Sequence, residues 1–413
     1  MQPVPNYIAL AVPFFFVFIG LELWLARRRK AEVYRLNDAV SDLSAGVFQQ
    51  VSLIFFKAGL IAVYAAVWQR FSLFSLSAKS PWTWILAIVL IDLVYYFWHR
   101  LSHEVNFLWA AHVVHHSSEE YNLAVALRQG VATPVTYLPF HMPLALLGVP
   151  PVVAASVDAF NTLYQFWIHT RLIGKMGPLE KWINTPSAHR VHHAVNPRYL
   201  DKNYGGTFMI WDRLFGTYEP ETEEPVYGLV KPLNSLEPLQ AQLHFWGEIW
   251  QRARQTPRLR DKLLVLVKGP AWTPLGMAPF PPPPEVRPET FVKHDPPIAP
   301  ALGRYLVAQI GVVVAFATLL MFFETKLPMP KLVVGAGLVF LALFSWGALV
   351  EGRRWALTLE IVRLSLCVAG AAAMAWGTPY LAPAVGATAL FAAAMAAWVS
   401  RCSPRPQAVW SAP

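Results

Sequence analysis

Two histidine clusters of the same form occur in this chain, and a third, shorter cluster precedes them. On an α-helix, residues at i, i+3 and i+4 lie on one face, so each cluster would present its imidazoles in a common direction. Neutral imidazole is a ligand for zinc, copper, iron and nickel, and eight imidazoles exceed what one ion accepts. The spacing therefore predicts a site for two metal ions. The clusters are His99-Arg-Leu-Ser-His103, His112-Val-Val-His115-His116 and His189-Arg-Val-His192-His193.

The alternative is that these histidines only pack and form hydrogen bonds in a protein core. Ten of the twelve histidines fall between positions 99 and 193, and eight of those follow ligand spacing, which favours metal binding. Zinc is the weaker choice, because the chain has neither H-E-x-x-H nor C-x-x-C, and structural zinc closes with four ligands. Iron suits an all-nitrogen site that carries out redox chemistry.

The rest of the chain must place these clusters in or at a membrane. Of the 413 residues, 55% are hydrophobic and 14% charged, with a mean hydropathy of +0.38, which is too apolar for a soluble protein of this size. Because ~20 apolar residues cross a bilayer, we expect spans at the ranges given next, with 131–167 broken near Gly148 into two passes. These ranges are 7–26, 46–68, 82–98, 131–167, 305–323, 332–350, 357–376 and 384–399.

Basic residues set the expected orientation of these spans. Arg27-Arg28-Arg29-Lys30 follows the first apolar run, so the positive-inside rule places this segment in the cytoplasm. Counting crossings from there brings all the histidine clusters to the cytoplasmic face, and it also places Arg353 and Arg354 inside. We therefore predict an all-α, multi-span integral membrane protein with a cytosolic, histidine-rich di-metal cap. The net charge of +9 suits anionic lipid, and no motif favours nucleic acid.

The chain divides into three parts by composition. We expect a catalytic domain at 1–275, a Pro-rich linker at 276–300 and a C-terminal transmembrane bundle at 301–400. Inside the bundle, Glu360 and Arg363 lie at i and i+3, where they can pair with each other. The two cysteines, Cys367 and Cys402, offer neither a disulfide framework nor a thiolate metal site.

A second amphipathic pattern lies before the linker. Leucine and tryptophan recur at helical spacing from Leu236 to Trp250, and five basic residues follow between Arg252 and Lys262. This pattern is typical either of an interfacial helix that guides a lipid toward the site or of ordinary packing against the cytosolic cap.

The order of the three clusters on apolar helices resembles the fatty acid hydroxylase and sterol desaturase superfamily of membrane di-iron oxygenases. Further motifs along nearly the whole chain resemble the alkylglycerol monooxygenase family within it. They include His115-His116-Ser-Ser-Glu119, Tyr121-Asn122-Leu, Ala126-Leu-Arg128-Gln129, Tyr164-Gln165-Phe-Trp-Ile-His169-Thr170, Asp201-Lys202-Asn203-Tyr204, Tyr227-Gly228-Leu and Lys268-Gly269-Pro270.

The resemblance implies that the eight cluster histidines ligate two irons. His169 is a ninth candidate, because it ends an apolar run at the same expected membrane face; it could complete the coordination of one iron or hydrogen-bond to a ligand. His141, His244 and His294 match no cluster and are expected to have no part in the site.

Three polar residues are candidates to support the ligands. Asp92 lies two helical turns before His99, inside an expected span, where it could accept a proton from a ligand imidazole or pair with another neighbour. Glu104 directly follows His103 and could orient an imidazole. Asn196, which follows the last cluster, could form a turn that positions it or contact a substrate headgroup.

The implied reaction is oxygen-dependent hydroxylation of a lipid alkyl chain, with cleavage of an alkylglycerol ether as the first choice. The family that the chain resembles draws electrons from tetrahydrobiopterin, but no pterin, flavin, dinucleotide or haem motif is present, so the reductant is external: a pterin or an electron-transfer protein. The alternative is a hydroxylase or desaturase of another lipid, such as a fatty acyl, sterol or sphingoid compound. A transporter is disfavoured, because the histidines gather at one membrane face and no internal repeat is seen.

Overall fold

The computed structural model describes residues 6–402, and the regular structure of this part is helical. Fifteen α-helices, three short 3-10 helices and two isolated β-bridges occur in it, which confirms the all-α prediction. The α-helices are α1 (Tyr7–Arg29), α2 (Leu36–Leu53), α3 (Lys57–Phe71), α4 (Pro81–Glu104), α5 (Asn106–His116), α6 (Thr133–Leu146), α7 (Pro151–Trp167), α8 (Pro186–His193), α9 (Ile210–Phe215), α10 (Pro238–Gln255), α11 (Leu259–Val267), α12 (Pro300–Phe323), α13 (Met329–Val350), α14 (Ala356–Ala375) and α15 (Leu381–Arg401).

Six helices are long and apolar enough to cross a membrane, namely α1, α4, α12, α13, α14 and α15. Each overlaps an expected span, so the multi-pass prediction is confirmed. The expected single span at 46–68 is instead broken into α2 and α3, which are bent by 57° between Leu53 and Lys57. Asp38, Asp42 and Gln49 of α2 are buried against protein, where they avoid the cost of facing lipid.

The apolar stretch at 131–167 also differs from two full passes. It breaks at the predicted place, where Gly148 has φ +89° and a Cβ would lie 1.9 Å from the Phe74 carbonyl oxygen, so only glycine fits this turn. The resulting helices have 14 and 17 residues. At ~1.5 Å per residue, α6 and α7 are about 21 and 26 Å long, and both fall short of a ~30 Å hydrocarbon core.

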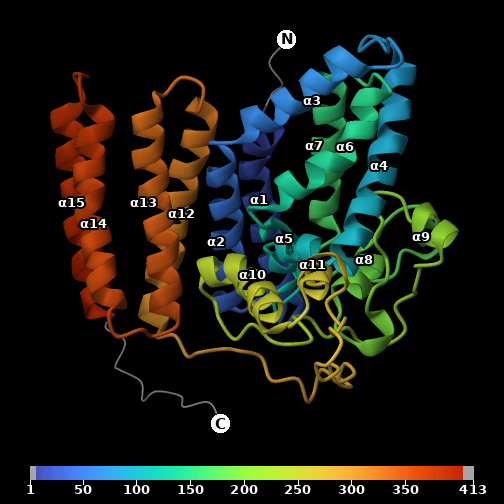
Figure 1. Cartoon of the computed structure of the whole chain (residues 1–413). Helices are drawn as coiled ribbons and strands as arrows, with labels where there is room; N and C mark the ends of the chain where they lie inside the picture. Colours follow the sequence, from blue (N-terminus) through green and yellow to red (C-terminus); the bar gives the residue numbers. More distant parts are fainter. Residues whose placement is uncertain (1–5, 403–413) are drawn as a thin grey trace. The chain divides into compact units, whose positions relative to one another are not determined.

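The contacts divide the chain into two compact units. Among the described residues, unit 1 comprises 6–35, 55–233 and 242–293, and unit 2 comprises 36–54, 234–241 and 294–402. In unit 1, α3, α4, α6 and α7 share a core around Ile91, Leu144 and Val153, whereas Phe245 of α10 and Val265 of α11 pack on α5. In unit 2, α2 packs against α12 and α13, and α14 and α15 complete the bundle (Figure 1).

The Pro-rich segment at 276–299 contains no helix. It is tied to unit 1 at its far end, where Lys293 Nζ lies 2.5 Å from a Glu120 carboxylate oxygen. The same carboxylate also pairs with Arg35 and Arg171 at 3.1 and 2.6 Å. Three cations thus surround Glu120, which comes soon after the second histidine cluster.

Candidate metal centre

Three helices carry the eight cluster histidines. His99 and His103 lie in the last turns of α4, His112, His115 and His116 end α5, and His189, His192 and His193 lie on α8. The short α8 begins with Pro186 after Thr185, whose hydroxyl accepts a hydrogen bond from the Ala188 amide and caps the helix. The i, i+3, i+4 spacing on these helices therefore directs the imidazoles to one region.

The structure brings all nine candidate histidines together in two groups. Within each group, one ring nitrogen of every histidine lies within 4.8 Å of those of the others. The first group takes both histidines of α4, and α8 contributes to both groups. His169, which follows α7, completes the second group. His141, His244 and His294 lie outside both. The first group is His99, His103, His112, His116 and His192, and the second is His115, His169, His189 and His193.

Backbone carbonyls fix the tautomer of four of these rings. A carbonyl oxygen only accepts hydrogen bonds, so the Nδ1 atom that faces it must carry the proton, and Nε2 is left with a free lone pair. The four donors and their acceptors are His99 to Tyr204 at 2.8 Å, His115 to Arg128 at 2.8 Å, His169 to Gln165 at 2.7 Å and His192 to Lys202 at 2.9 Å.

Some of the free lone pairs then face one another. The Nε2 atoms of His115 and His169 are 3.3 Å apart, although both rings have their proton on Nδ1. Four further Nε2–Nε2 distances among the nine rings are between 2.9 and 3.2 Å. Two lone pairs at this distance repel each other unless a proton or a metal cation lies between them. The donor set is thus one that fits metal ions.

Burial makes it unfavourable to protonate these rings, so protons do not generally relieve the repulsion between the facing lone pairs. Each of the nine side chains is buried or nearly so, and charged imidazolium is disfavoured away from water. Burial lowers the pKa of His115 to about 4 and that of His192 to about 3, so both rings are neutral at pH 7. In addition, His103 Nε2 and His193 Nε2 are buried and have no hydrogen-bond partner within residues 6–402.

Asp92 supports a loop that carries one of the anchoring carbonyls. Its carboxylate accepts hydrogen bonds from the Thr207 and Phe208 amides at 2.7 and 3.1 Å and from Trp211 Nε1 at 2.9 Å. His99, the candidate ligand nearest to it in sequence, donates to the Tyr204 carbonyl instead. Asp92 therefore acts on the loop around Tyr204.

The other two polar candidates also bind protein groups. Glu104 accepts from Arg100 Nε at 2.8 Å in an i, i+4 pair at the surface. Asn196 accepts from the Val226 amide at 2.8 Å and donates to the Glu224 carbonyl at 3.1 Å. These contacts hold residues 224–226 beside the end of α8, where Ala194 and Tyr227 form an isolated bridge.

Sequence reasoning missed several supporting residues. Asp212 accepts from the Tyr204 and Gly205 amides and from the Thr217 hydroxyl, all at 2.7 Å, and burial raises the pKa of Asp212 to about 6. The buried Arg128 donates to the Val114 carbonyl and to Ser117 while its own carbonyl accepts from His115. No spacing rule connects these residues to the clusters, because their partners are backbone atoms of distant loops.

Known proteins match this chain both in the histidine region and over most of its length. The Fatty acid hydroxylase family profile matches residues 84–217, which include all nine histidines. Alkylglycerol monooxygenase from Homo sapiens is 41% identical over 376 residues, covering 88% of this chain and 82% of that protein. The proteins of the same name from Xenopus tropicalis and Danio rerio are 40% and 39% identical over 374 residues, covering 89% of this chain and 82% of theirs. No solved structure matches significantly.

Proposed function

The chain belongs to the alkylglycerol monooxygenase family, and from this premise we propose that it is a di-iron enzyme that cleaves the ether bond of alkylglycerols. Family membership makes it a lipid monooxygenase with an oxygen-dependent activity. The observation that carries the metal part of the proposal is the set of facing Nε2 lone pairs, above all between His115 and His169. Iron is favoured over zinc, because a monooxygenase needs a redox-active metal and zinc has no redox chemistry.

Two irons in the histidine groups would supply the activation of dioxygen. The chain's own residues would then hold the imidazoles neutral, with Nδ1 donating to a carbonyl and Nε2 available as a ligand. Hydroxylation of the alkyl carbon beside the ether oxygen gives a hemiacetal, and this collapses to a fatty aldehyde and glycerol. One oxygen atom enters the lipid, and two electrons and two protons reduce the other to water.

An external donor must supply these two electrons. We propose tetrahydrobiopterin, from the family to which the chain belongs, with a small electron-transfer protein as the other choice. The cytoplasmic position of the site is part of the same proposal. It is supported by Arg27 to Lys30 at the end of α1. In this scheme the bent α2–α3 pair counts as one broken span, and the α6–α7 hairpin adds two half-crossings that leave the side of the chain unchanged.

The test is the release of fatty aldehyde from an alkylglycerol by the iron-loaded protein in nanodiscs, with and without tetrahydrobiopterin and oxygen. We expect aldehyde only when both are present, about two irons per chain by metal analysis, and no aldehyde from His115→Ala or His192→Ala. Two bound irons without aldehyde would shift the proposal to hydroxylation or desaturation of another lipid. Activity retained in either histidine variant would contradict the di-iron site itself.

A further inference from the structure

His169 differs from the other eight candidate ligands in how it is held. The other eight lie on α4, α5 or α8, where the helix itself fixes their relative positions. His169 lies two residues beyond the end of α7, in a turn. Its Nε2 is nevertheless 3.3 Å from that of His115 and 3.1 Å from that of His189. The Nδ1 bond to the Gln165 carbonyl ties the ring to α7, and tertiary contacts of the neighbouring residues must then hold this turn against α5 and α8.

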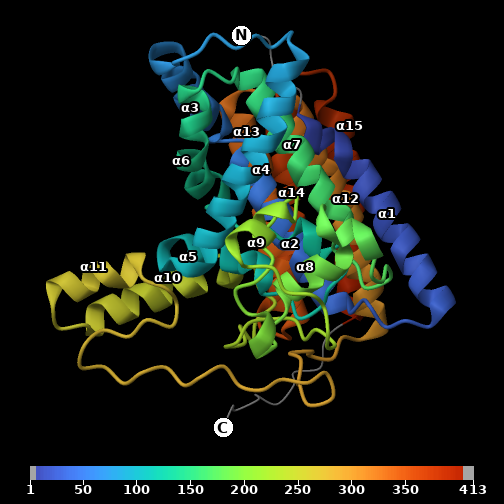
Figure 2. The same cartoon turned by 90° about the vertical axis from the view of Figure 1, so that its right-hand side faces the viewer.

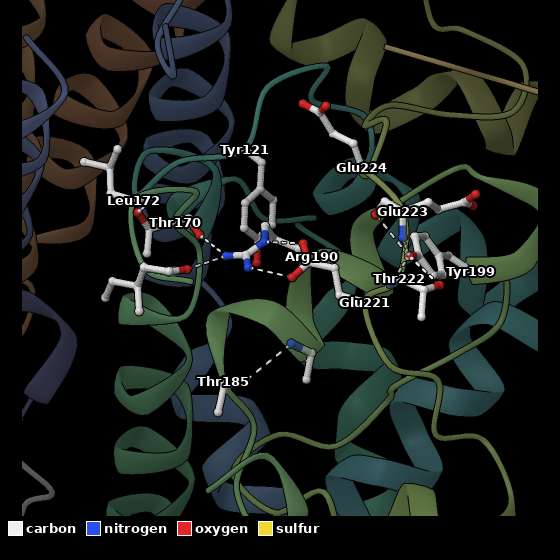
Figure 3. Close-up of polar contacts among 12 residues, drawn as sticks. Tyr121, Thr170, Leu172, Thr185, Arg190, Tyr199, Glu221, Thr222, Glu223 and Glu224 are labelled. Carbon is white, nitrogen blue, oxygen red and sulfur yellow. Dashed lines mark hydrogen bonds and ion pairs between the residues drawn. The ribbon is translucent and has the colours of Figure 1, made fainter. Parts of the chain in front are cut away.

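The contacts converge on the next residue, Thr170, from two sides. On one side, the Thr170 hydroxyl donates to Glu22 of α1 at 2.5 Å. On the other side, the Thr170 carbonyl accepts from Arg190 Nη1 at 2.9 Å (Figure 3). Thr170 is only 4% exposed, so both bonds are shielded from water.

Arg190 is well placed for this contact because of its position in the third histidine cluster. It follows His189 directly on α8, so it points about 100° away from that ligand around the helix axis. Its Nη1 also donates to the Ile173 carbonyl at 2.7 Å. Its Nε and Nη2 donate to the two carboxylate oxygens of Glu221, each at 2.7 Å (Figure 3). The guanidinium thus links α8, the 170–173 turn and the 217–226 loop.

Glu22 is equally committed to this region. It is buried in α1, and its second oxygen accepts from the Tyr34 hydroxyl at 2.5 Å and from the Leu123 amide at 2.9 Å. Between Leu123 and the second cluster lies Tyr121, whose hydroxyl donates to the Ile168 carbonyl and whose ring stacks on His169 with centroids 5.5 Å apart. The residues on both sides of His169 are therefore bound.

We propose that Arg190 and Glu22 are positioning residues for the second histidine group, which hold Thr170 from two sides and so keep His169 at ligand distance from His115, His189 and His193. The inference rests on the proposed metal function and specifies how one metal subsite is built. It predicts that the two subsites respond differently: loss of Arg190 weakens the second group and spares the first. Replacing a residue that hydrogen-bonds to a metal ligand typically lowers metal affinity by about 10- to 100-fold.

The experiment measures metal content and the spectrum of bound cobalt in the full-length protein, with wild type, His169→Ala and Arg190→Gln compared. We expect about two metals per chain in wild type and a fall toward one in both variants, with the same d–d bands lost. The His169→Ala/Arg190→Gln double variant should lose no more metal than His169→Ala alone, because Arg190 acts through His169. Thr170→Val, which removes only the hydroxyl donor to Glu22, should give a milder loss and guards against a folding defect.

The matched control is Arg198→Gln. Arg198 pairs at 2.6 Å with Glu219, which lies in the same 217–226 loop as Glu221. Its side chain is more than half exposed, and within residues 6–402 its ion pair and hydrogen bond are with Glu219 and not with a histidine cluster. This variant should keep both metals. A wild-type protein without metal would refute the proposed function. A wild type with two metals, together with an Arg190→Gln variant that keeps both and has an unchanged spectrum, would refute the positioning role alone.

Discussion

The candidate ligand histidines depend on backbone atoms more than on neighbouring side chains. Four of the nine have Nδ1 bonded to a main-chain carbonyl, and three of these carbonyls lie in loops, at Arg128, Lys202 and Tyr204. Other side chains support the rings indirectly by holding these loops; Asp212, for example, accepts a hydrogen bond from the Tyr204 amide. The acceptors are main-chain atoms, so the site requires the loop conformation that presents them, and at Arg128 the buried side chain itself helps to hold that conformation.

Neutral, buried histidines make the metal-free protein sensitive to acid. Burial holds the folded-state pKa of His115 at about 4 and lowers those of His112, His116, His189 and His193 below 6.5. The unfolded chain binds protons near pH 6.5 and the folded chain does not, so this stability is full above pH 6.5 and is lost as the pH falls toward 4. Each such histidine costs about 1.4 kcal/mol per pH unit in this window.

We therefore expect chelator-treated protein to unfold at a clearly lower temperature at pH 5.5 than at pH 7.5. Thermal denaturation in nanodiscs at both pH values measures this effect. The His103→Ala/His115→Ala double variant, which retains fewer buried imidazoles, should show a smaller difference. An apo protein equally stable at both pH values would mean that the rings are already protonated in the folded state.

Among the helices, α14 carries an unusual polar cluster. The predicted pair of Glu360 and Arg363 is confirmed, with both side chains buried and their atoms 2.5 Å apart. The cluster extends over three helices, because Glu360 also accepts from Tyr305 of α12 and from Ser345 of α13, and Arg363 donates to Gln309. Such a network specifies how α12, α13 and α14 pack, since a shifted helix would leave a buried charge unpaired.

Glu360→Gln should strongly destabilise this bundle, because it leaves the Arg363 guanidinium buried without a counter-charge, at a cost of about 3–5 kcal/mol. The measurement is the aggregation temperature of the detergent-solubilised protein. Replacing both residues, as in Glu360→Leu/Arg363→Met, should recover most of the loss. Arg353→Gln removes the surface pair with Glu351 and serves as the control. Equal effects of the single and double replacements would argue against the ion pair as the cause.

At the scale of the whole molecule, the sequence predicted the helices, most spans and the gathering of the histidines, because helical periodicity and hydropathy are local signals. His99 to His193 gather as expected. The bend between α2 and α3 was missed, and so was the shortness of α6 and α7, although the break near Gly148 was predicted; contacts with distant parts of the chain are not visible in a local pattern. For the same reason Arg190 and Asp212 were not recognised. The domain boundaries at 275 and 300 stay a prediction, and the contacts add 36–54 to the C-terminal unit.

The helices α10 and α11 carry an exposed apolar stripe that could contact lipid. Figure 2 shows them running across the direction of α4. Their inner face packs on α5 through Phe245, Ile249 and Val265. An adjoining stripe is exposed, with Leu243 at 53% and Trp250 at 70% on α10, continued on α11 by Leu259 and Leu263. Basic residues from Arg252 to Lys262 follow, which is the composition of a helix pair in a membrane interface.

We expect this stripe to lie in the bilayer interface, directly behind the helix that carries three of the histidines. A fluorophore attached at Leu243→Cys or Trp250→Cys, with Cys367 and Cys402 replaced by alanine, should be quenched by brominated lipid in nanodiscs. A label at Gln251→Cys, on the polar side of α10, should not be. In addition, Leu243→Glu/Trp250→Glu should lower turnover of a bilayer-dissolved alkylglycerol by roughly tenfold, or about 1.4 kcal/mol, with a much smaller effect on a short-chain substrate in detergent. Equal quenching at positions 243 and 251 would mean that the stripe packs against protein or faces water, and α10 would then serve only as support for α5.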